Sequence, residues 1–180
     1  STLFPYTTLF RSAAQVDGVS VAGAVADVAG GRLYSAGAGL GARCTDARGT
    51  RRLHCSAVGD LAMALLGTGF GYAASTRASQ AALLARMLPK VRDVRRIGSA
   101  ALDLCMVGAG RLDAFYEHGL NVWDWAAGAL IAAEAGARLH LPEPAGPVGG
   151  AGLVIAAAPG IADELVATLA RFDGLAALPT

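Results

Sequence analysis

Hydrophobic and polar positions follow short, mostly strand-like patterns in the first third of the chain. Valine and alanine dominate residues 19–28, which predicts a buried strand. Gly30–Gly31 then marks a turn before residues 32–36, so these segments together predict a hairpin. The glycine-rich residues 37–50 are expected to form a loop. Two more short strands are predicted at 52–57 and 62–69.

From residue 75 onward the pattern changes to helices that alternate with strands. Ser75 or Thr76 can cap a first helix, which Pro89 ends. Ser99 caps a second helix, which Gly110 ends. Two further helices are predicted at 123–136 and 162–172, and Pro159 opens the second of these. The other predicted elements are strands at 91–98, 112–118, 137–141 and 153–158, and a loop at 142–152. Alternating strands and helices predict a layered α/β fold, and the early hairpin predicts a mixed sheet.

Composition narrows the class of protein. The chain has 180 residues, 54% hydrophobic and 16% charged, which suits one folded domain. Its net charge of +1 gives no electrostatic reason to expect a nucleic-acid or membrane partner. Mean hydropathy is +0.46, but there is no run of about 18 apolar residues, so no membrane span is expected. Three cysteines without CxxC spacing (Cys44, Cys55 and Cys105) indicate reduced thiols and a cytoplasmic protein.

The first twelve residues, STLFPYTTLFRS, differ from the rest of the chain because they contain no alanine or glycine. They resemble one reading frame of a common sequencing adapter over all twelve positions. We therefore expect three parts in the chain: an adapter-derived segment at 1–12, a folded domain at 13–173 and a tail at 174–180 that frays. The alternative is that residues 1–12 are a natural edge strand.

Several common motifs are absent or incomplete. Residues 37–41 read GAGLG, which lacks the G-x-G-x-x-G spacing of a dinucleotide-binding turn. The three histidines, His54, His118 and His140, are scattered and predict no metal site.

The segment from Gly98 to Gly136 carries the strongest chemical signal. Gly98 and Ser99 begin a helix whose free N–H groups suit an anion, although an ordinary serine cap explains Ser99 equally well. Asp124 begins the next helix, and Glu117 precedes it at a strand end. Two carboxylates where a strand ends and a helix starts could hold a hard cation and a substrate hydroxyl. Trp123 and Trp125 flank Asp124, and we expect both to pack around it.

The same segment resembles the C-terminal signature of the inositol monophosphatase family. The family pattern is Y-x-E, a short loop, W-D-x-A-A-G and an E-A-G turn. It corresponds here to Tyr116–Glu117, Trp123–Gly128 and Glu134–Gly136. The resemblance covers most of residues 16–171. It implies a layered αβαβα sandwich of the inositol monophosphatase and sugar phosphatase type, and hydrolysis of phosphate monoesters by a water that Mg²⁺ activates.

The resemblance also implies roles for individual residues. Asp124 matches the metal-ligand aspartate of the W-D motif, and Glu117 matches a residue that binds substrate hydroxyls. Gly98, Ser99 and Ala100 match a substrate-contacting G-T/S-A segment, with serine in place of threonine. We placed no role on Asn121 or Val122. No catalytic residue is assigned, because the family's upstream glutamate segment and D-P-x-D-G-T motif do not occur in the chain.

These observations predict an N-terminally truncated domain that is inactive alone and exposes apolar surface. The parent enzyme would act on inositol monophosphate, a small phosphorylated polyol, and could be a homodimer. Histidinol phosphate, an adenosine bisphosphate and fructose bisphosphate remain alternative substrates. A non-catalytic small-molecule-binding or interaction domain is the alternative from another functional class.

Overall fold

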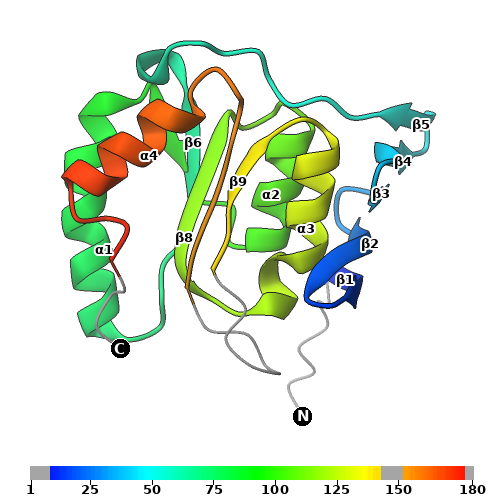
Figure 1. Cartoon of the computed structure of the whole chain (residues 1–180), viewed down its shortest axis with the longest axis horizontal. Helices are drawn as coiled ribbons and strands as arrows, with labels where there is room; N and C mark the ends of the chain where they lie inside the picture. Colours follow the sequence, from blue (N-terminus) through cyan, green and yellow to red (C-terminus); the bar gives the residue numbers. More distant parts are fainter. Residues whose placement is uncertain (1–8, 143–151, 177–180) are drawn as a thin grey trace.

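The computed structural model describes residues 9–142 and 152–176. Figure 1 shows four layers across the molecule: helices α1 (Ala74–Met87) and α4 (Ala162–Arg171), a mixed sheet, helices α2 (Ala100–Gly108) and α3 (Val122–Glu134), and an antiparallel sheet. This α/β sandwich confirms the predicted fold class. The part of the predicted loop at 143–151 and the end of the tail at 177–180 lie outside the described residues.

The antiparallel sheet contains the five strands nearest the N-terminus, in the order in which they follow along the chain. The strands are β1 (Leu9–Val16), β2 (Val19–Asp27), β3 (Arg32–Gly37), β4 (Gly41–Asp46) and β5 (Gly49–Arg52). The β2–β3 hairpin confirms the prediction. The expected loop at 37–50 was wrong, because glycines with positive φ, Gly39, Gly41 and Gly49, form tight turns between β3, β4 and β5.

Strand β2 is only half-buried, contrary to the prediction for residues 19–28. Val25 is fully buried, while Val19 and Val21 are exposed. Gly23 lies directly against α3, since a Cβ atom at Gly23 would come within 3.0 Å of the Ala127 Cα. One face of this sheet therefore packs on α3, and the other face is not covered by the described residues. The hairpins form a sheet of their own, so they do not create the mixed sheet that we expected.

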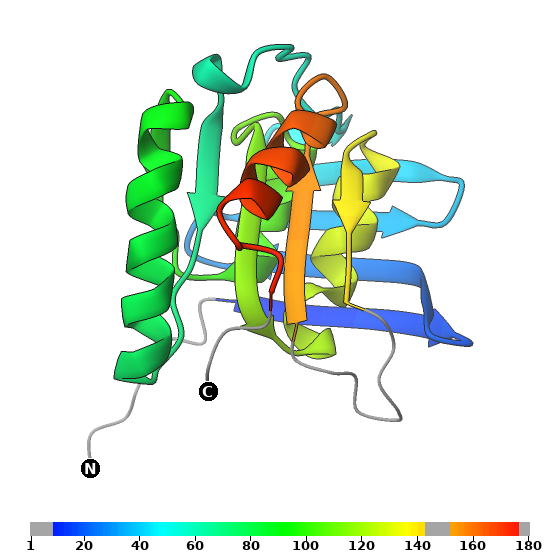
Figure 2. The same ribbon diagram turned by 60° about the vertical axis from the view of Figure 1, so that its left-hand side comes forward.

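The second sheet is mixed and has the order β7-β6-β8-β10-β9. Its strands are β6 (Leu65–Thr68), β7 (Asp93–Arg95), β8 (Ala114–Leu120), β9 (Arg138–His140) and β10 (Gly152–Ala157). Strand β6 runs parallel to β7 and β8, whereas β10 runs antiparallel to β8 and β9. Figure 2 shows α1 and α4 over one face of this sheet.

The predicted strand at 52–57 does not form beyond Arg52. Instead, the Leu53 and Cys55 N–H groups donate to the carbonyls of Ala42 and Ala135, so this segment is bound to β4 and to the C-terminal end of α3. The predicted strand at 62–69 is shorter, because a 3-10 turn, η1 (Leu61–Met63), comes before β6.

Local capping explains most of the helix boundaries. The Ser99 hydroxyl accepts from the Leu102 N–H at 3.4 Å, which confirms Ser99 as the cap of α2. Helix α1 begins after Ala73 without a side-chain cap, so the cap at Ser75 or Thr76 was wrong. Pro89 ends α1 within a 3-10 turn, η2 (Leu88–Lys90). Helix α4 begins after Ile161, two residues beyond Pro159, so Pro159 does not open it.

The position of the hydrophobic core follows from the order of the layers. Helix α3 lies between the two sheets, and the unbroken run Trp125–Ala132 is buried. A helix that is apolar on all sides is expected only where protein surrounds it. None of the helices in the described part of the chain is both long enough and apolar enough to cross a bilayer.

Candidate functional site

The candidate site lies where β6 ends, beside β8 and the N-terminal ends of α2 and α3. Strand β8 pairs with β6 up to Thr68, so Glu117 lies next to the residue that follows β6. A Cβ atom at Gly69 would come within 2.1 Å of Glu117 Oε2. The carboxyl group therefore lies on the bare backbone of Gly69, at the carboxyl end of a parallel strand pair, where α/β proteins bind ligands.

Asp124 is the third residue of α3 and closes a capping box with Asn121. The Asn121 N–H donates to Asp124 Oδ2 at 3.1 Å. Arg11 Nη2 lies 2.9 Å from Asp124 Oδ1, and Arg11 Nε donates to the Trp123 carbonyl. Both carboxylate oxygens of Asp124 thus have partners from the chain itself. Asn121, to which we gave no role, is the residue that begins α3.

The two tryptophans do not pack around Asp124 as predicted. Trp125 is buried in the core, but Trp123 is 51% exposed. A groove of about 620 Å³ lies between β1 and the start of α3, with Arg11 and Trp123 among its lining residues. Asp124 is held by its hydrogen bonds and its ion pair, and not by packing between the two tryptophan rings.

Glu117 lies in an unusual electrostatic environment. Burial raises its pKa to about 7, and the nearby Asp124 charge adds to this effect, while Arg96 opposes it. Two carboxylates from β8 and α3 are therefore within electrostatic range, as the sequence analysis expected. The other predicted residues lie at the start of α2: Gly98 has a φ of +92°, Ser99 caps the helix and Ala100 is its first residue.

The sequence analysis missed Asp103. Its side chain is buried in the first turn of α2, and its pKa rises to about 8 because of burial and the Glu117 charge. The signal was a single charged residue inside the apolar run SAALDLCM, four residues after the cap. We took Asp103 only as an interruption of a hydrophobic stretch.

The described residues do not by themselves make a metal site. They contain no group of three or more histidine, cysteine, aspartate or glutamate side chains that could hold an ion. Mg²⁺ binds proteins through several oxygen ligands and gives up its waters reluctantly. Asp124, already paired with Arg11, does not meet this requirement alone. Nor do the histidines contribute, since His118 Nε2 lies 2.8 Å from the Gly174 carbonyl oxygen.

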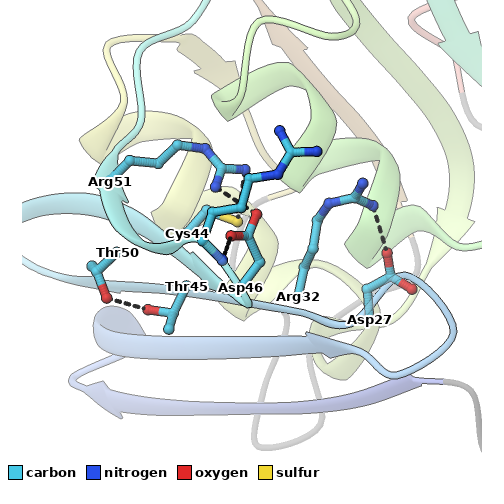
Figure 3. Close-up of polar contacts among 8 residues, drawn as sticks. Asp27, Arg32, Cys44, Thr45, Asp46, Thr50 and Arg51 are labelled. Carbon is cyan, nitrogen blue, oxygen red and sulfur yellow. Dashed lines mark hydrogen bonds and ion pairs between the residues drawn. The ribbon is translucent and has the colours of Figure 1, made fainter.

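A second polar cluster lies on the hairpins of the antiparallel sheet and is shown in Figure 3. Asp46 Oδ2 pairs with Arg51 at 2.7 Å, and Arg51 also donates to the Cys44 sulfur at 3.3 Å. Asp27 pairs with Arg32 at 3.4 Å across the β2–β3 turn. These acidic and basic groups neutralise one another, so the cluster stabilises hairpins and offers no free acidic ligands.

Taken together, the fold and the site define a layered α/β domain with carboxylates gathered where a strand ends and two helices begin. A family model described as the inositol monophosphatase family matches residues 13–174. The chain belongs to the inositol monophosphatase family, which is generally metal-dependent.

Individual relatives agree with this assignment. An inositol-1-monophosphatase of Mycobacterium leprae is 73% identical over 164 residues, which are 91% of this chain and 56% of that protein. The solved structure of Mycobacterium tuberculosis SuhB superposes with a TM-score of 0.85 at 64% identity, covering 92% of this chain and 65% of that one. A Pasteurella multocida relative named Nus factor SuhB is 42% identical over 126 residues, 69% of this chain and 45% of that protein. The chain thus spans only about half the length of these curated relatives, 56% of the Mycobacterium leprae protein and 45% of the Pasteurella multocida protein.

Proposed function

We propose that the family-length protein with this sequence is a magnesium-dependent phosphomonoesterase. It converts myo-inositol 1-phosphate and water into myo-inositol and phosphate. The observation that carries this proposal is the pair of electrostatically coupled carboxylates, Glu117 and Asp124, beside the N-terminal end of α2. The 73% identity to a protein named inositol-1-monophosphatase supports the same substrate class.

Three groups of residues have distinct roles in this proposal. Glu117 accepts hydrogen bonds from hydroxyls of the polyol. Gly98, Ser99 and Ala100 face the substrate with the free N–H groups at the start of α2, which favour an anionic group. Asp124 supplies one magnesium ligand in the family-length protein, where other carboxylates complete the site. The net charge of +1 gives no electrostatic reason for a nucleic-acid or membrane partner, and the three cysteines without CxxC spacing support a cytoplasmic enzyme that binds a small molecule.

The 180-residue chain alone is proposed to lack this activity. A second candidate function for the chain is therefore a non-catalytic small-molecule-binding domain. The Arg11–Asp124 ion pair, which places a guanidinium beside the carboxylate proposed to hold a cation, favours it if residues 1–12 are a natural edge strand and not adapter-derived.

A phosphate-release assay with magnesium and myo-inositol 1-phosphate tests the proposed activity. The family-length protein is expected to hydrolyse myo-inositol 1-phosphate. Asp124→Asn is expected to reduce the rate by at least 100-fold, which corresponds to an increase of about 2.7 kcal/mol or more in the activation free energy. Asp163→Asn is the matched control, because Asp163 also lies in the first turn of a helix and pairs with an arginine, Arg138. It should retain activity.

Retained activity in Asp124→Asn would contradict the role of Asp124. Clear turnover by the 180-residue chain would contradict its proposed inactivity and remove the case for a non-catalytic domain. Histidinol phosphate, an adenosine bisphosphate and fructose bisphosphate belong in the same assay. A higher kcat/KM with any of them would replace inositol phosphate as the assigned substrate.

A further inference from the structure

Asp103 is the most deeply buried charged residue in the described part of the chain. Its relative exposure is 1%. Within the described residues, neither carboxyl oxygen has a hydrogen-bond partner. Burial makes the charged form of Asp103 costly and outweighs the Ser99 backbone N–H and the Arg96 charge, which favour that form, so an acid in this position is expected to keep its proton.

The position of Asp103 links it to the candidate site. A Cβ atom at Gly67 would come within 3.0 Å of Asp103 Oδ1, and one at Gly69 within 2.1 Å of Glu117 Oε2. Residues two apart on a strand face the same side. The Asp103 and Glu117 side chains therefore lie against the same face of residues 67–69, where two glycines leave room for both carboxyl groups.

The charged groups around this pair come from three elements. Arg96 precedes α2 and acts on both carboxyls, and Asp124 on α3 acts on Glu117. The Glu117 charge on β8 raises the pKa of Asp103, after the larger effect of burial. The two carboxyls are therefore electrostatically coupled, so ionisation of both at once is unfavourable.

We propose that Asp103 is a positioning residue that keeps its proton beneath β6, so that the Asp103–Glu117 pair carries a single negative charge, on Glu117. With Asp103 neutral, the Glu117 carboxylate accepts hydrogen bonds from ligand hydroxyls without a second negative charge next to it. The inference rests on the proposed function only in assigning the ligand hydroxyls to Glu117. A purely stabilising role does not account for Asp103. In the unfolded state the aspartate ionises freely near neutral pH, so keeping it neutral in the folded state lowers the free energy of unfolding.

The first test compares the 180-residue chain with Asp103→Asn in denaturant unfolding from pH 4 to pH 8.5. The folded-state pKa of Asp103 is raised to about 8 from an unfolded value of 3.8. Its contribution to stability is therefore fully present below about pH 4 and is lost as the pH rises toward 8. Asparagine imitates the neutral acid and does not titrate. The variant is expected to match the wild type near pH 4 and to show a higher denaturant midpoint at pH 8.

Asp163→Asn, at an exposed site, should show no such gain at pH 8. An Asp103→Asn variant that is less stable than the wild type at pH 8 would overturn the proposal. If the variant does not fold, the second test decides, because it includes the wild-type chain.

The second test follows carboxyl ¹³C shifts by NMR in aspartate- and glutamate-labelled protein. In the wild type, Asp103 should titrate above pH 7. In Asp103→Asn, the Glu117 midpoint should stay within about half a pH unit of the wild-type value, whereas Glu117→Gln should lower the Asp103 midpoint. A buried carboxyl that does not interact with Glu117 would instead titrate at the same midpoint in Glu117→Gln as in the wild type. Titration of Asp103 near pH 4 would overturn the proposal.

Addition of myo-inositol separates the two proposals. A shift of the Glu117 signal would support its role with ligand hydroxyls and would support the present inference. No shift would contradict the ligand role in the proposed function, while the Asp103 titration would still decide the charge state of the pair.

Discussion

At the scale of single residues, the chemistry depends on which polar groups find partners. Asp124 has both oxygens bound, Glu117 lies half-buried on a glycine, and Asp103 is enclosed without a hydrogen bond among the described residues. Buried polar groups of this last kind cost stability, so each one needs a specific explanation. Another one is His118, whose Nδ1 atom has no partner in the described structure.

His118 is expected to make the fold sensitive to acid. Burial lowers its pKa from 6.5, although the hydrogen bond with the Gly174 carbonyl opposes this effect. Because the folded-state pKa is lower than the unfolded one, its contribution to stability is present above pH 6.5 and is lost as the pH falls. His118→Phe should therefore lose less unfolding free energy than the wild type between pH 7 and pH 5.

The comparison with His118→Phe cancels the opposite pH dependence of Asp103 and Glu117, since both remain in the variant. His54→Gln is the control, because His54 is exposed, and it should follow the wild-type pH curve. Equal pH curves for wild type and His118→Phe, measured by chemical denaturation, would show that His118 does not titrate in this range.

At the scale of elements, the close approach of α2 and α3 holds the site together. Gly128 on α3 leaves no room for a side chain, because a Cβ atom there would lie 2.8 Å from the Leu104 Cβ and 3.0 Å from the Ala101 carbonyl oxygen. Both helices begin at the candidate site, so their separation sets the relative positions of Ser99 and Asp124.

Gly128→Ala is expected to destabilise the protein, although alanine favours helix formation over glycine by about 1 kcal/mol. Overpacking of the helix interface should cost about 1–3 kcal/mol, measured by denaturant unfolding. Ala133→Gly, at an exposed position of α3, provides the control for helix propensity alone and should cost about 1 kcal/mol. A more stable Gly128→Ala variant would mean that the two helices can separate freely.

At the scale of the whole molecule, the antiparallel sheet has one apolar face toward α3 and another that the described residues leave open. Val25 and Tyr34 are buried against the helices. Their chain neighbours Ala26 and Leu33 point the other way, in register with Phe10. Phe10 is 61% and Leu33 45% exposed. An exposed apolar sheet surface of this kind favours association.

We therefore expect the 180-residue chain to self-associate through this face. Leu33→Lys should reduce the apparent mass in light scattering at a given concentration, because a charge opposes apolar contact between sheets. Met63→Lys changes another exposed hydrophobic residue, 59% exposed, that lies outside this sheet, in η1, and should leave association unchanged. Equal effects of both variants would indicate general solubility and not association through this face.

Local pattern determined a large part of this structure in advance. The β2–β3 hairpin, the cap at Ser99 and the apolar helix α3 follow from turn glycines, a hydroxyl before an apolar run, and helical spacing. The layered α/β fold and membership in the family also followed from the sequence, through a long motif around Glu117 and Asp124. Each of these features depends on residues that are neighbours in the chain.

Only the tertiary structure decided which groups meet across elements. The Arg11–Asp124 pair joins residues 113 positions apart, and Asp103 lies within electrostatic range of Glu117 because each carboxyl group packs on a glycine of residues 67–69. The glycine-rich segment at 37–50 became two hairpins because β3 was present to pair with it. Partners distant in sequence leave no periodic signal, since their proximity depends on how the layers pack and not on the local order of residues.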